Sequence, residues 1–304
     1  MGDGSGVVGV ICGPTGAGKS ALAMALAAAH PVTIISADSR QVYRDFDIGT
    51  GKPSDGERAR VPHEGINVVA PEERYSAAAW SAGAEGWIAD ARARGRVPLV
   101  VGGTGFYIRA LTEPLFAEPE LDAARRTALA SATAALATPE LRRWCAALDP
   151  ARAHLGRAQL LRAIEVALLT GRPISEWQAR PLRAPTVARY LVVDPGPVLK
   201  EWIASRVLSM LDAGWEAEVG SLMRDVPTNA PAWNATGYSL VREHVDGTIT
   251  RDEMAARITI ATRQYAKRQR TWFRHQLDGD VTMLDPTEPS AADVAANWFD
   301  GLTI

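Results

Sequence analysis

The sequence contains few cysteines and no long apolar stretch. Its two cysteines, Cys12 and Cys145, lie far apart and outside any CxxC or Cys/His ligand spacing. A disulfide framework and a structural zinc site are therefore not expected, and a reducing cytoplasm fits this composition. No segment approaches the ~20 apolar residues of a membrane span. The run Val7–Cys12 is too short for the core of a signal peptide. We expect a soluble, cytoplasmic protein.

The chain also lacks a strong net charge. A formal charge of −2 neither favours nor excludes a nucleic-acid partner, because such partners bind local basic patches. With 47% hydrophobic and 22% charged residues, the composition is that of an ordinary globular protein. Its 304 residues are enough for one large domain, or for a core domain with an insertion.

Short apolar runs recur along the N-terminal third of the chain and again in the C-terminal part. These runs, which are typical of buried strands, are Val7–Cys12, Val32–Ser36, Val97–Val101, Tyr190–Val193 and Val281–Leu284. The segments between the first three have helical composition. Residues 19–29 are rich in Ala and Leu and stop before Pro31, and Ser76 can cap a helix that runs to Arg94. This alternation predicts an α/β fold, a parallel sheet flanked by helices.

The pattern changes in the middle of the chain. From about residue 119 to 185 the sequence shows helical periodicity, with many Ala, Leu and Arg and no convincing strand. We therefore predict an α/β core at 1–114 and 188–304, interrupted by an all-helical insertion at 115–187. The segment 42–62, rich in Gly, Asp and Pro, is expected to be a loop.

The most specific local motif is a complete P-loop, G-x-x-x-x-G-K-S/T, between a predicted strand and a predicted helix. It consists of Gly13, Pro14, Thr15, Gly16, Ala17, Gly18, Lys19 and Ser20. Backbone N–H groups of such a loop surround phosphate oxygens, and the dipole of the following helix favours the anion. Lys19 can neutralise a terminal phosphate, and the Ser20 hydroxyl can hold Mg²⁺. The motif predicts a site for a small molecule that contains pyrophosphate.

A second acidic residue, which a nucleotide hydrolase needs as a Mg²⁺ ligand at the end of another strand, is missing. The run Val97–Val101 leads into Gly102-Gly103-Thr104, without a carboxylate. The acid that does follow a strand is Asp38. A carboxylate there suits a general base that acts on an acceptor group. On spacing alone, a turn or capping role for Asp38 stays open as an alternative.

Further recognisable segments follow the P-loop in collinear order over nearly the whole chain, at 35–43, 47–53, 75–78, 98–107, 162–166, 214–219 and 261–269. Asp-Ile-Gly-Thr-x-Lys-Pro at 47–53 and Gly-Gly-Thr-Gly-x-Tyr at 102–107 are far more specific than a P-loop alone. Together these segments resemble the tRNA dimethylallyltransferase (isopentenyltransferase) family. The resemblance implies a P-loop NTPase-like core that transfers a dimethylallyl group from its diphosphate to adenosine N6. That adenosine is 3′-adjacent to the anticodon, in tRNAs that read codons starting with U.

The resemblance also implies roles for individual residues. The P-loop holds the leaving pyrophosphate, which accounts for the missing second acid because no attacking water has to be positioned. Asp38 accepts the proton of the adenine amine, and Thr104 lies close to the reacting centre. Arg206 binds pyrophosphate together with Lys19 and Mg²⁺. Without the resemblance, Arg206 would be interpreted as a solvated surface charge. The implied tRNA contacts are Asp38, Ser39, Arg40, Gln41, Gln159, Arg162, Arg263, Lys267 and Arg270.

The expected helix at 252–275 gives separate support for an RNA partner. Its cations Arg263, Lys267, Arg270 and Arg274 recur on one face, nearly opposite Ile258, Tyr265 and Trp272. No acid compensates this face, so it suits a phosphate backbone better than a merely solvated surface. The insertion adds candidate contacts for an anticodon stem–loop at Arg142, Arg143, Arg152, Arg157 and Arg162.

One segment departs from the family, and two other activities stay open. Where the family usually shows Asn-Asp-x-x-Arg, the chain has a different and shortened stretch at 154–162, which puts tRNA affinity or specificity in question more than the chemistry. Transfer to free adenine nucleotides is one alternative. The other is a small-molecule kinase that holds ATP in the P-loop and uses Asp38 on a hydroxyl. The basic helix and the long insertion favour tRNA. We expect a monomer that binds dimethylallyl diphosphate and the anticodon stem–loop, with no membrane partner.

Overall fold

The computed structural model describes residues 6–113, 119, 121–179 and 185–302, and it divides into two compact units. Unit 1 comprises Met1–Thr112 and Thr186–Ile304, and unit 2 comprises Glu113–Pro185. The insertion expected from the sequence, 115–187, is displaced from unit 2 by two residues at each end. Each unit is described separately.

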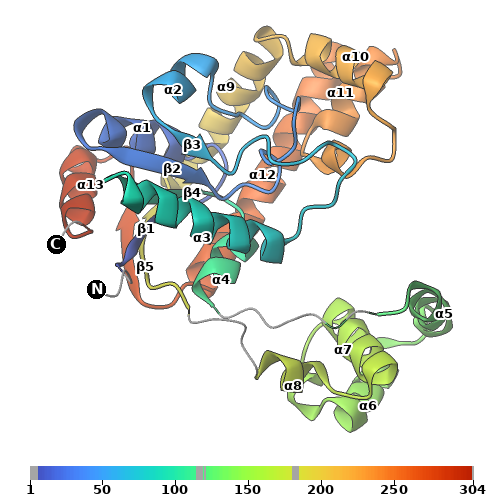
Figure 1. Cartoon of the computed structure of the whole chain (residues 1–304). Coiled ribbons are helices and arrows are strands. Elements are labelled where there is room, and N and C mark those ends of the chain that lie inside the picture. The colour runs from blue at the N-terminus through green and yellow to red at the C-terminus, as the bar shows by residue number, and fades with distance from the viewer. Residues whose placement is uncertain (1–5, 114–118, 120, 180–184, 303–304) are drawn as a thin grey trace. The chain divides into compact units, whose positions relative to one another are not determined.

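Unit 1 is built on a parallel sheet, which Figure 1 shows with the helices around it. The strands are β1 (Val8–Cys12), β2 (Val32–Ser36), β3 (His63–Glu64), β4 (Val97–Gly102), β5 (Ala188–Val193) and β6 (Asp280–Leu284). Their order is β3-β2-β4-β1-β5-β6, and every pair of neighbours is parallel. All residues of β1 and β2 are buried, as expected for strands covered on both faces. The predicted α/β fold is confirmed, and each apolar run forms a strand.

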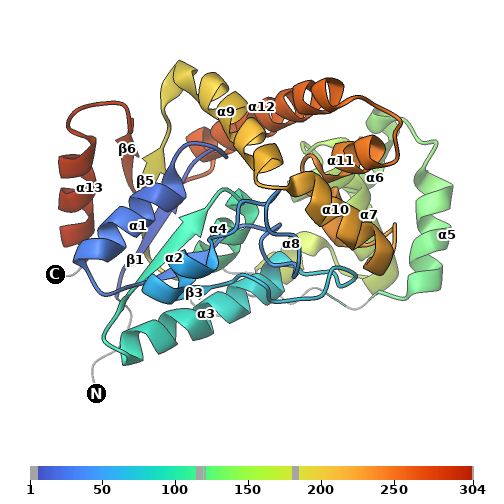
Figure 2. The same ribbon diagram turned by 90° about the horizontal axis from the view of Figure 1, so that it is seen from above.

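The helices of unit 1 include those that the sequence predicts after the P-loop and after Ser76. They are α1 (Lys19–Ala29), α2 (Asp55–Arg60), α3 (Ala77–Ala93), α4 (Gly105–Thr112), α9 (Leu199–Asp212), α10 (Trp215–Asp225), α11 (Tyr238–Val245), α12 (Arg251–His275) and α13 (Ala291–Asp300). Short 3₁₀ turns span Gly196–Val198 and Pro231–Asn234. Figure 2 shows α12 running alongside α9, with α10 and α11 packed nearby. None of the described helices has the length and apolar character needed to cross a bilayer.

Helix α2 corrects the expectation that the whole of 42–62 is a loop. Ser54 and Glu57 form a capping box: the Ser54 hydroxyl accepts from the Glu57 N–H, and the Glu57 carboxylate accepts from the Ser54 N–H. This reciprocal pair satisfies two donors at the helix start, which is enough to order one and a half turns within a polar segment.

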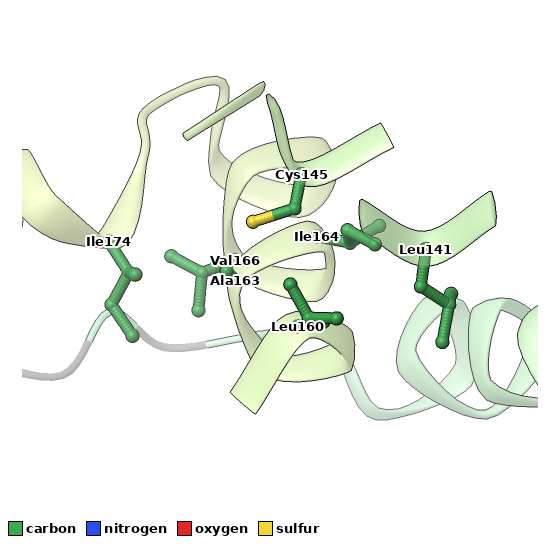
Figure 3. Close-up of a cluster of buried hydrophobic side chains, with 7 residues drawn as sticks. All are labelled: Leu141, Cys145, Leu160, Ala163, Ile164, Val166 and Ile174. Carbon is green, nitrogen blue, oxygen red and sulfur yellow. The ribbon is translucent and has the colours of Figure 1, made fainter. Parts of the chain in front are cut away.

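The described residues of unit 2 form helices joined by short turns, and they contain no strand. The unit contains α5 (Ala123–Thr133), α6 (Thr138–Leu148), a 3₁₀ turn at Pro150–Arg152, α7 (Arg157–Thr170) and α8 (Ile174–Gln178). A compact apolar cluster joins α6, α7 and α8 (Figure 3); it consists of Leu141, Cys145, Leu160, Ala163, Ile164, Val166 and Ile174. Cys145 is a free, buried thiol within this core, as Cys12 is within β1. Both cysteines therefore act as small apolar side chains.

Candidate active site

The P-loop connects β1 to α1 through a tight backbone turn. Gly13 and Gly18 have φ angles of 138° and 90°, a region that glycine enters without a steric penalty. An added Cβ at Gly13 would collide with the Val193 carbonyl oxygen of β5. Gly18 is the N-cap of α1, so the helix N-terminus faces the loop. This is the backbone arrangement that binds phosphate oxygens.

Two cations from distant parts of the sequence meet at this loop. Lys19 donates from Nζ to the Pro14 carbonyl at 2.7 Å. Burial and, to a smaller extent, the neighbouring Arg206 together lower the pKa of Lys19 to about 8, although Asp38 opposes both effects. Arg206, on α9, is half-buried; burial lowers its pKa too, again opposed by Asp38. Arg206 is therefore no solvated surface charge. Two neighbouring cations that are both partly desolvated are stabilised when an anion binds between them.

Asp38 and Thr104 lie at the ends of neighbouring strands. Parallel β2 and β4 are paired up to Ser36 and Val101, so their following loops meet at the same sheet edge. Thr104 donates its N–H to the Ala37 carbonyl at 3.1 Å, and its hydroxyl oxygen accepts the Ser39 N–H at 3.0 Å. One Asp38 carboxylate oxygen accepts the Arg40 N–H at 2.8 Å. Asp38 thus has the turn role that its spacing allows, within a loop bonded to Thr104.

A pocket joins these polar groups to an apolar wall. Its lining residues are Thr15, Asp38, Arg40, Gly49, Thr50, Ile203, Arg206, Val207, Met210, Trp215, Ala235, Thr236, Ile258, Thr262 and Tyr265. Charged groups therefore come from the loop after β2 and from α9, and apolar groups come from α9 to α12. The pocket can hold a ligand with an anionic end and an apolar end.

Tyr265 is a pocket residue that the sequence places only on the apolar face of its helix. Burial raises the pKa of Tyr265 to about 12, and the nearby Asp38 carboxylate adds to this increase. The hydroxyl lies within hydrogen-bonding reach of Thr104. A tyrosine in this setting stays protonated at neutral pH, beside the two residues predicted to act at the reacting centre.

The segment Asp47–Pro53, one of the two most specific motifs of the sequence, supports a wall of the pocket. Lys52 is buried and donates from Nζ at 2.5 Å to the Tyr43 carbonyl, to Asp47 Oδ1 and to Asn67 Oδ1. An added Cβ at Gly51, where φ is 63°, would collide with the Arg206 guanidinium. The segment is therefore folded by Lys52 and lies directly against Arg206.

Glu218 of α10 fixes the start of the same segment. Its Oε2 accepts the Ile48 N–H at 2.7 Å and the Asp47 N–H at 3.1 Å, while the Tyr238 hydroxyl donates to Oε1 at 2.6 Å. Burial and the Glu218 carboxylate raise the pKa of Tyr238, which keeps this hydroxyl a donor. Nothing in the spacing of Glu218 indicates its bonds to this segment, because the backbone groups that it accepts from are about 170 residues away.

Two of the residues implied as tRNA contacts near β2 form hydrogen bonds within the protein. The Gln41 amide donates to the Thr50 and Gly51 carbonyls at 3.2 and 3.0 Å and accepts from the Ser36 hydroxyl at 2.8 Å. The Ser39 N–H is bonded to Thr104. Arg40 lines the pocket. A tRNA contact by these residues stays a prediction; the structure gives Gln41 a bracing role within unit 1.

The basic face of α12 is only partly exposed. Lys267 and Arg274 are exposed, and Arg263 is exposed while donating to the Lys200 carbonyl at 3.0 Å. Arg270 is half-buried, forms an ion pair with Asp194 and donates to the Gly196 carbonyl. Asp194 therefore compensates Arg270, contrary to the expectation that this face has no acidic partner. Asp194 comes from the end of β5, where helical spacing cannot detect it.

The opposite face of α12 contains a residue that sequence reasoning missed. Gln269 is 6% exposed. Its Oε1 accepts the Thr15 N–H of the P-loop at 2.8 Å, and its Nε2 donates to the Gly103 carbonyl at 2.7 Å. A glutamine within a basic helix normally indicates a solvated position, so no sequence signal singled it out.

The candidate residues of unit 2 form contacts within that unit. Gln159 accepts the Gly156 N–H at 3.3 Å at the start of α7. Arg162 pairs with Glu165. Arg157 donates to the Leu136 and Ala134 carbonyls, so it ties α7 to the connection between α5 and α6. The segment 154–162, which differs from the family motif, thus leads into the first turns of α7. Its contacts with tRNA stay predictions.

The Ser20 hydroxyl can bind a divalent cation, and the protein offers that cation few other ligands. Ser20 is exposed and lines a hollow that also includes Asp47, Asp55 and Arg206. The described residues contain no cluster of three or more His, Cys, Asp or Glu with metal-binding geometry. Mg²⁺ commonly keeps several waters and takes its remaining ligands from substrate phosphates. One hydroxyl beside a P-loop fits that ligand pattern.

Family models match the chain over most of its length. A model described as IPP transferase matches residues 41–276, and one described as isopentenyl transferase matches residues 6–62. A tRNA dimethylallyltransferase of Chromobacterium violaceum is 42% identical over 276 residues, which cover 87% of this chain and 85% of that protein. One from Halorhodospira halophila is 43% identical over 279 residues, covering 88% and 90%.

Solved structures share the fold over almost the whole chain. A tRNA isopentenylpyrophosphate transferase from Bacillus halodurans superposes with a TM-score of 0.70 at 29% identity, covering 97% of this chain and 96% of that one. A eukaryotic dimethylallyltransferase, described as acting on tRNA, superposes with a TM-score of 0.80 at 27% identity. It covers 97% of this chain, which covers 77% of that one.

Proposed function

This chain belongs to the IPP transferase family, and we propose that it transfers a dimethylallyl group from dimethylallyl diphosphate to tRNA. The acceptor is N6 of the adenosine 3′-adjacent to the anticodon, in tRNAs that read codons starting with U. The observation that carries the chemistry is the meeting of Lys19, Arg206 and Asp38 at one P-loop. The relatives and the eukaryotic structure, all named for action on tRNA, support the acceptor.

On the donor side, the P-loop binds the diphosphate through its backbone N–H groups and the N-terminus of α1. The bond between the prenyl carbon and the diphosphate oxygen breaks, and negative charge accumulates on the leaving group. Lys19 and Arg206 neutralise that charge from opposite segments of the core, where partial desolvation strengthens the interaction. When bound, Mg²⁺ supplies further positive charge to the diphosphate, and Ser20 is the residue we propose to hold it.

On the acceptor side, adenine N6 forms the new bond to the prenyl carbon and loses one proton. We assign that proton to the Asp38 carboxylate, which accepts it as general base. The Thr104 hydroxyl and the protonated Tyr265 orient the adenine amine, because Thr104 is bonded to the loop that contains Asp38 and Tyr265 of α12 lies near both residues. The apolar wall from α9 and α12 holds the dimethylallyl group.

For tRNA, the exposed cations of α12 are the best-supported contacts. Arg263 and Lys267 are solvent-exposed and can neutralise backbone phosphates. Arg270 contributes less in our proposal, because Asp194 already pairs with it. Unit 2, with Gln159 and Arg162, binds the anticodon stem–loop. The adenosine must leave its stack to enter the pocket, as bases do in other enzymes that modify them. We also propose that the enzyme acts in the cytoplasm, where tRNA is modified, and as a monomer.

One assay separates this activity from its alternatives. Purified protein is incubated with Mg²⁺ and labelled dimethylallyl diphosphate, together with undermodified tRNA or with AMP, and a parallel reaction contains ATP as phosphate donor. We expect label in tRNA. Label only in AMP would overturn the tRNA acceptor, and phosphate transfer from ATP without prenyl transfer would indicate a kinase.

A further inference from the structure

A single carboxamide links the P-loop to the turn that contains Thr104. Gln269 lies 6% exposed on the inner face of α12. It bonds on one side to the Thr15 N–H, at 2.8 Å, and on the other to the Gly103 carbonyl, at 2.7 Å. Gly103 directly precedes Thr104, and Thr15 lines the pocket with Asp38. The two bonds therefore span the distance between the donor side and the acceptor side of the site.

The space around this carboxamide is closely fitted. An added Cβ at Gly103 would collide with the Gln269 amide nitrogen and approach the Gly13 carbonyl to 3.3 Å. An added Cβ at Gly102 would collide with the Ala37 backbone. Since the Thr104 N–H is itself bonded to the Ala37 carbonyl, three loops are in contact here. They are the P-loop, the loop with Asp38 and the turn with Thr104.

We propose that Gln269 is a positioning residue that keeps the P-loop in register with this turn, so that diphosphate affinity depends on a residue outside the P-loop. The inference rests on the proposed function. Its chemical basis is that the Thr15 N–H requires an acceptor and the Gly103 carbonyl requires a donor. A neutral carboxamide supplies both at one position. A buried polar group that loses its partner is destabilised, and the loop would shift to relieve that cost.

Two substitutions of similar volume separate this role from simple packing. Gln269→Leu supplies neither the donor nor the acceptor. Gln269→Glu keeps an acceptor for the Thr15 N–H, but when ionised it places an oxygen against the Gly103 carbonyl. Burial raises the pKa of a carboxyl, and once protonated the group regains a donor. We therefore expect the Glu variant to lose donor affinity at high pH and to regain it at low pH. Gln264→Leu, at an exposed position of the same helix, is the matched control.

The readout is binding of dimethylallyl diphosphate with Mg²⁺, measured by titration calorimetry without tRNA at about pH 8 and about pH 6. The donor affinity of each variant is divided by the affinity of the unmodified protein at the same pH. Turnover with tRNA is then measured at saturating donor. Amide exchange of the P-loop peptide, relative to β1, reports whether the Thr15 N–H has lost its partner.

We expect Gln269→Leu to weaken donor binding about tenfold at both pH values, with faster exchange in the P-loop, as for a lost buried partner. Gln269→Glu should weaken donor binding by the same factor at high pH, and most of the lost affinity should return at low pH. Gln264→Leu should match the unmodified protein. Donor affinity within about twofold for both Gln269 variants at high pH would overturn the inference. If the Leu variant does not fold, the ratio of the Glu variant's donor affinities at the two pH values is sufficient to test the inference. An unmodified protein without prenyl transfer would instead refute the proposed function.

Discussion

Burial, together with Arg206 of α9, lowers the pKa of Lys19 in the P-loop, although the insertion separates the two residues in sequence. Two cations held this close destabilise each other until an anion binds between them. The P-loop therefore has a partner that a simple phosphate turn lacks. This pairing is consistent with a clamp for a leaving diphosphate, and it makes the donor site sensitive to pH.

Diphosphate binding should take up a proton above about pH 8. Lys19 has a pKa of about 8 in the folded protein, below its ordinary value of 10.5. Below pH 8 the side chain is already charged, and above it the ligand must restore the charge, so affinity falls as pH rises. Calorimetry in buffers of different ionisation enthalpy measures this uptake. Lys19→Ala should weaken binding and abolish the uptake; a pH-independent affinity in the unmodified protein would contradict this assignment.

The same shift affects stability with a definite sign. Because the folded pKa of Lys19 is lowered, the unfolded chain binds more protons between about pH 8 and 10.5. The contribution of Lys19 to the free energy of unfolding is therefore least favourable below pH 8 and improves as pH rises through that window. Comparison of denaturant unfolding of the unmodified protein and Lys19→Ala, at the two ends of the window, isolates this contribution.

Asp38→Asn should lose turnover while donor binding is kept. The asparagine retains an oxygen for the Arg40 N–H, so the turn is preserved, but it cannot accept a proton. We expect kcat to fall by about 10²–10⁴-fold, the usual contribution of a general base. Single-turnover kinetics and donor titration give the two quantities. Asp90→Asn, at an exposed position of α3, is the control. Near-normal turnover in Asp38→Asn would exclude the base role.

Glu218→Ala should destabilise the fold far more than Glu216→Ala on the same helix. The first change removes the acceptor for Asp47, Ile48 and Tyr238, and costs about 1–3 kcal/mol for unsatisfied groups. The second breaks a surface pair with Arg251, usually worth no more than about 1 kcal/mol. Denaturant unfolding of both variants tests the difference, and equal stability would show that the Glu218 bonds do not hold the 47–53 segment.

Lys267→Ala should weaken tRNA binding without changing stability. Loss of one phosphate contact lowers the slope of log affinity against log salt by about 1. Arg257→Ala is the matched control on the same helix, because Arg257 pairs with Glu243. Filter binding of tRNA over a range of salt concentrations measures the slopes. An unchanged slope for Lys267→Ala would remove the exposed part of α12 from the RNA interface.

Five of the six described strands, together with α1, α3 and α12, could be predicted because apolar periodicity and capping residues are local; β3, only two residues long, has no such signal. The P-loop could be identified because one short segment makes the whole motif. The roles of Gln269 and Glu218 could not be predicted, since the backbone groups that they bond belong to distant loops. Arg270 seemed uncompensated because the acid that pairs with it, Asp194, lies on another element. Spacing shows which residues share a helix face, but not which segment packs against that face.

The most direct test of the account is the position of the prenyl group in tRNA after reaction with dimethylallyl diphosphate. Labelled tRNAs that read codons starting with U, and others that do not, are digested, and the modified nucleoside is identified by mass spectrometry. We predict one N6-dimethylallyl adenosine, 3′-adjacent to the anticodon, in the first set only. Label at another nucleoside, or in neither set while AMP is modified, would contradict the account.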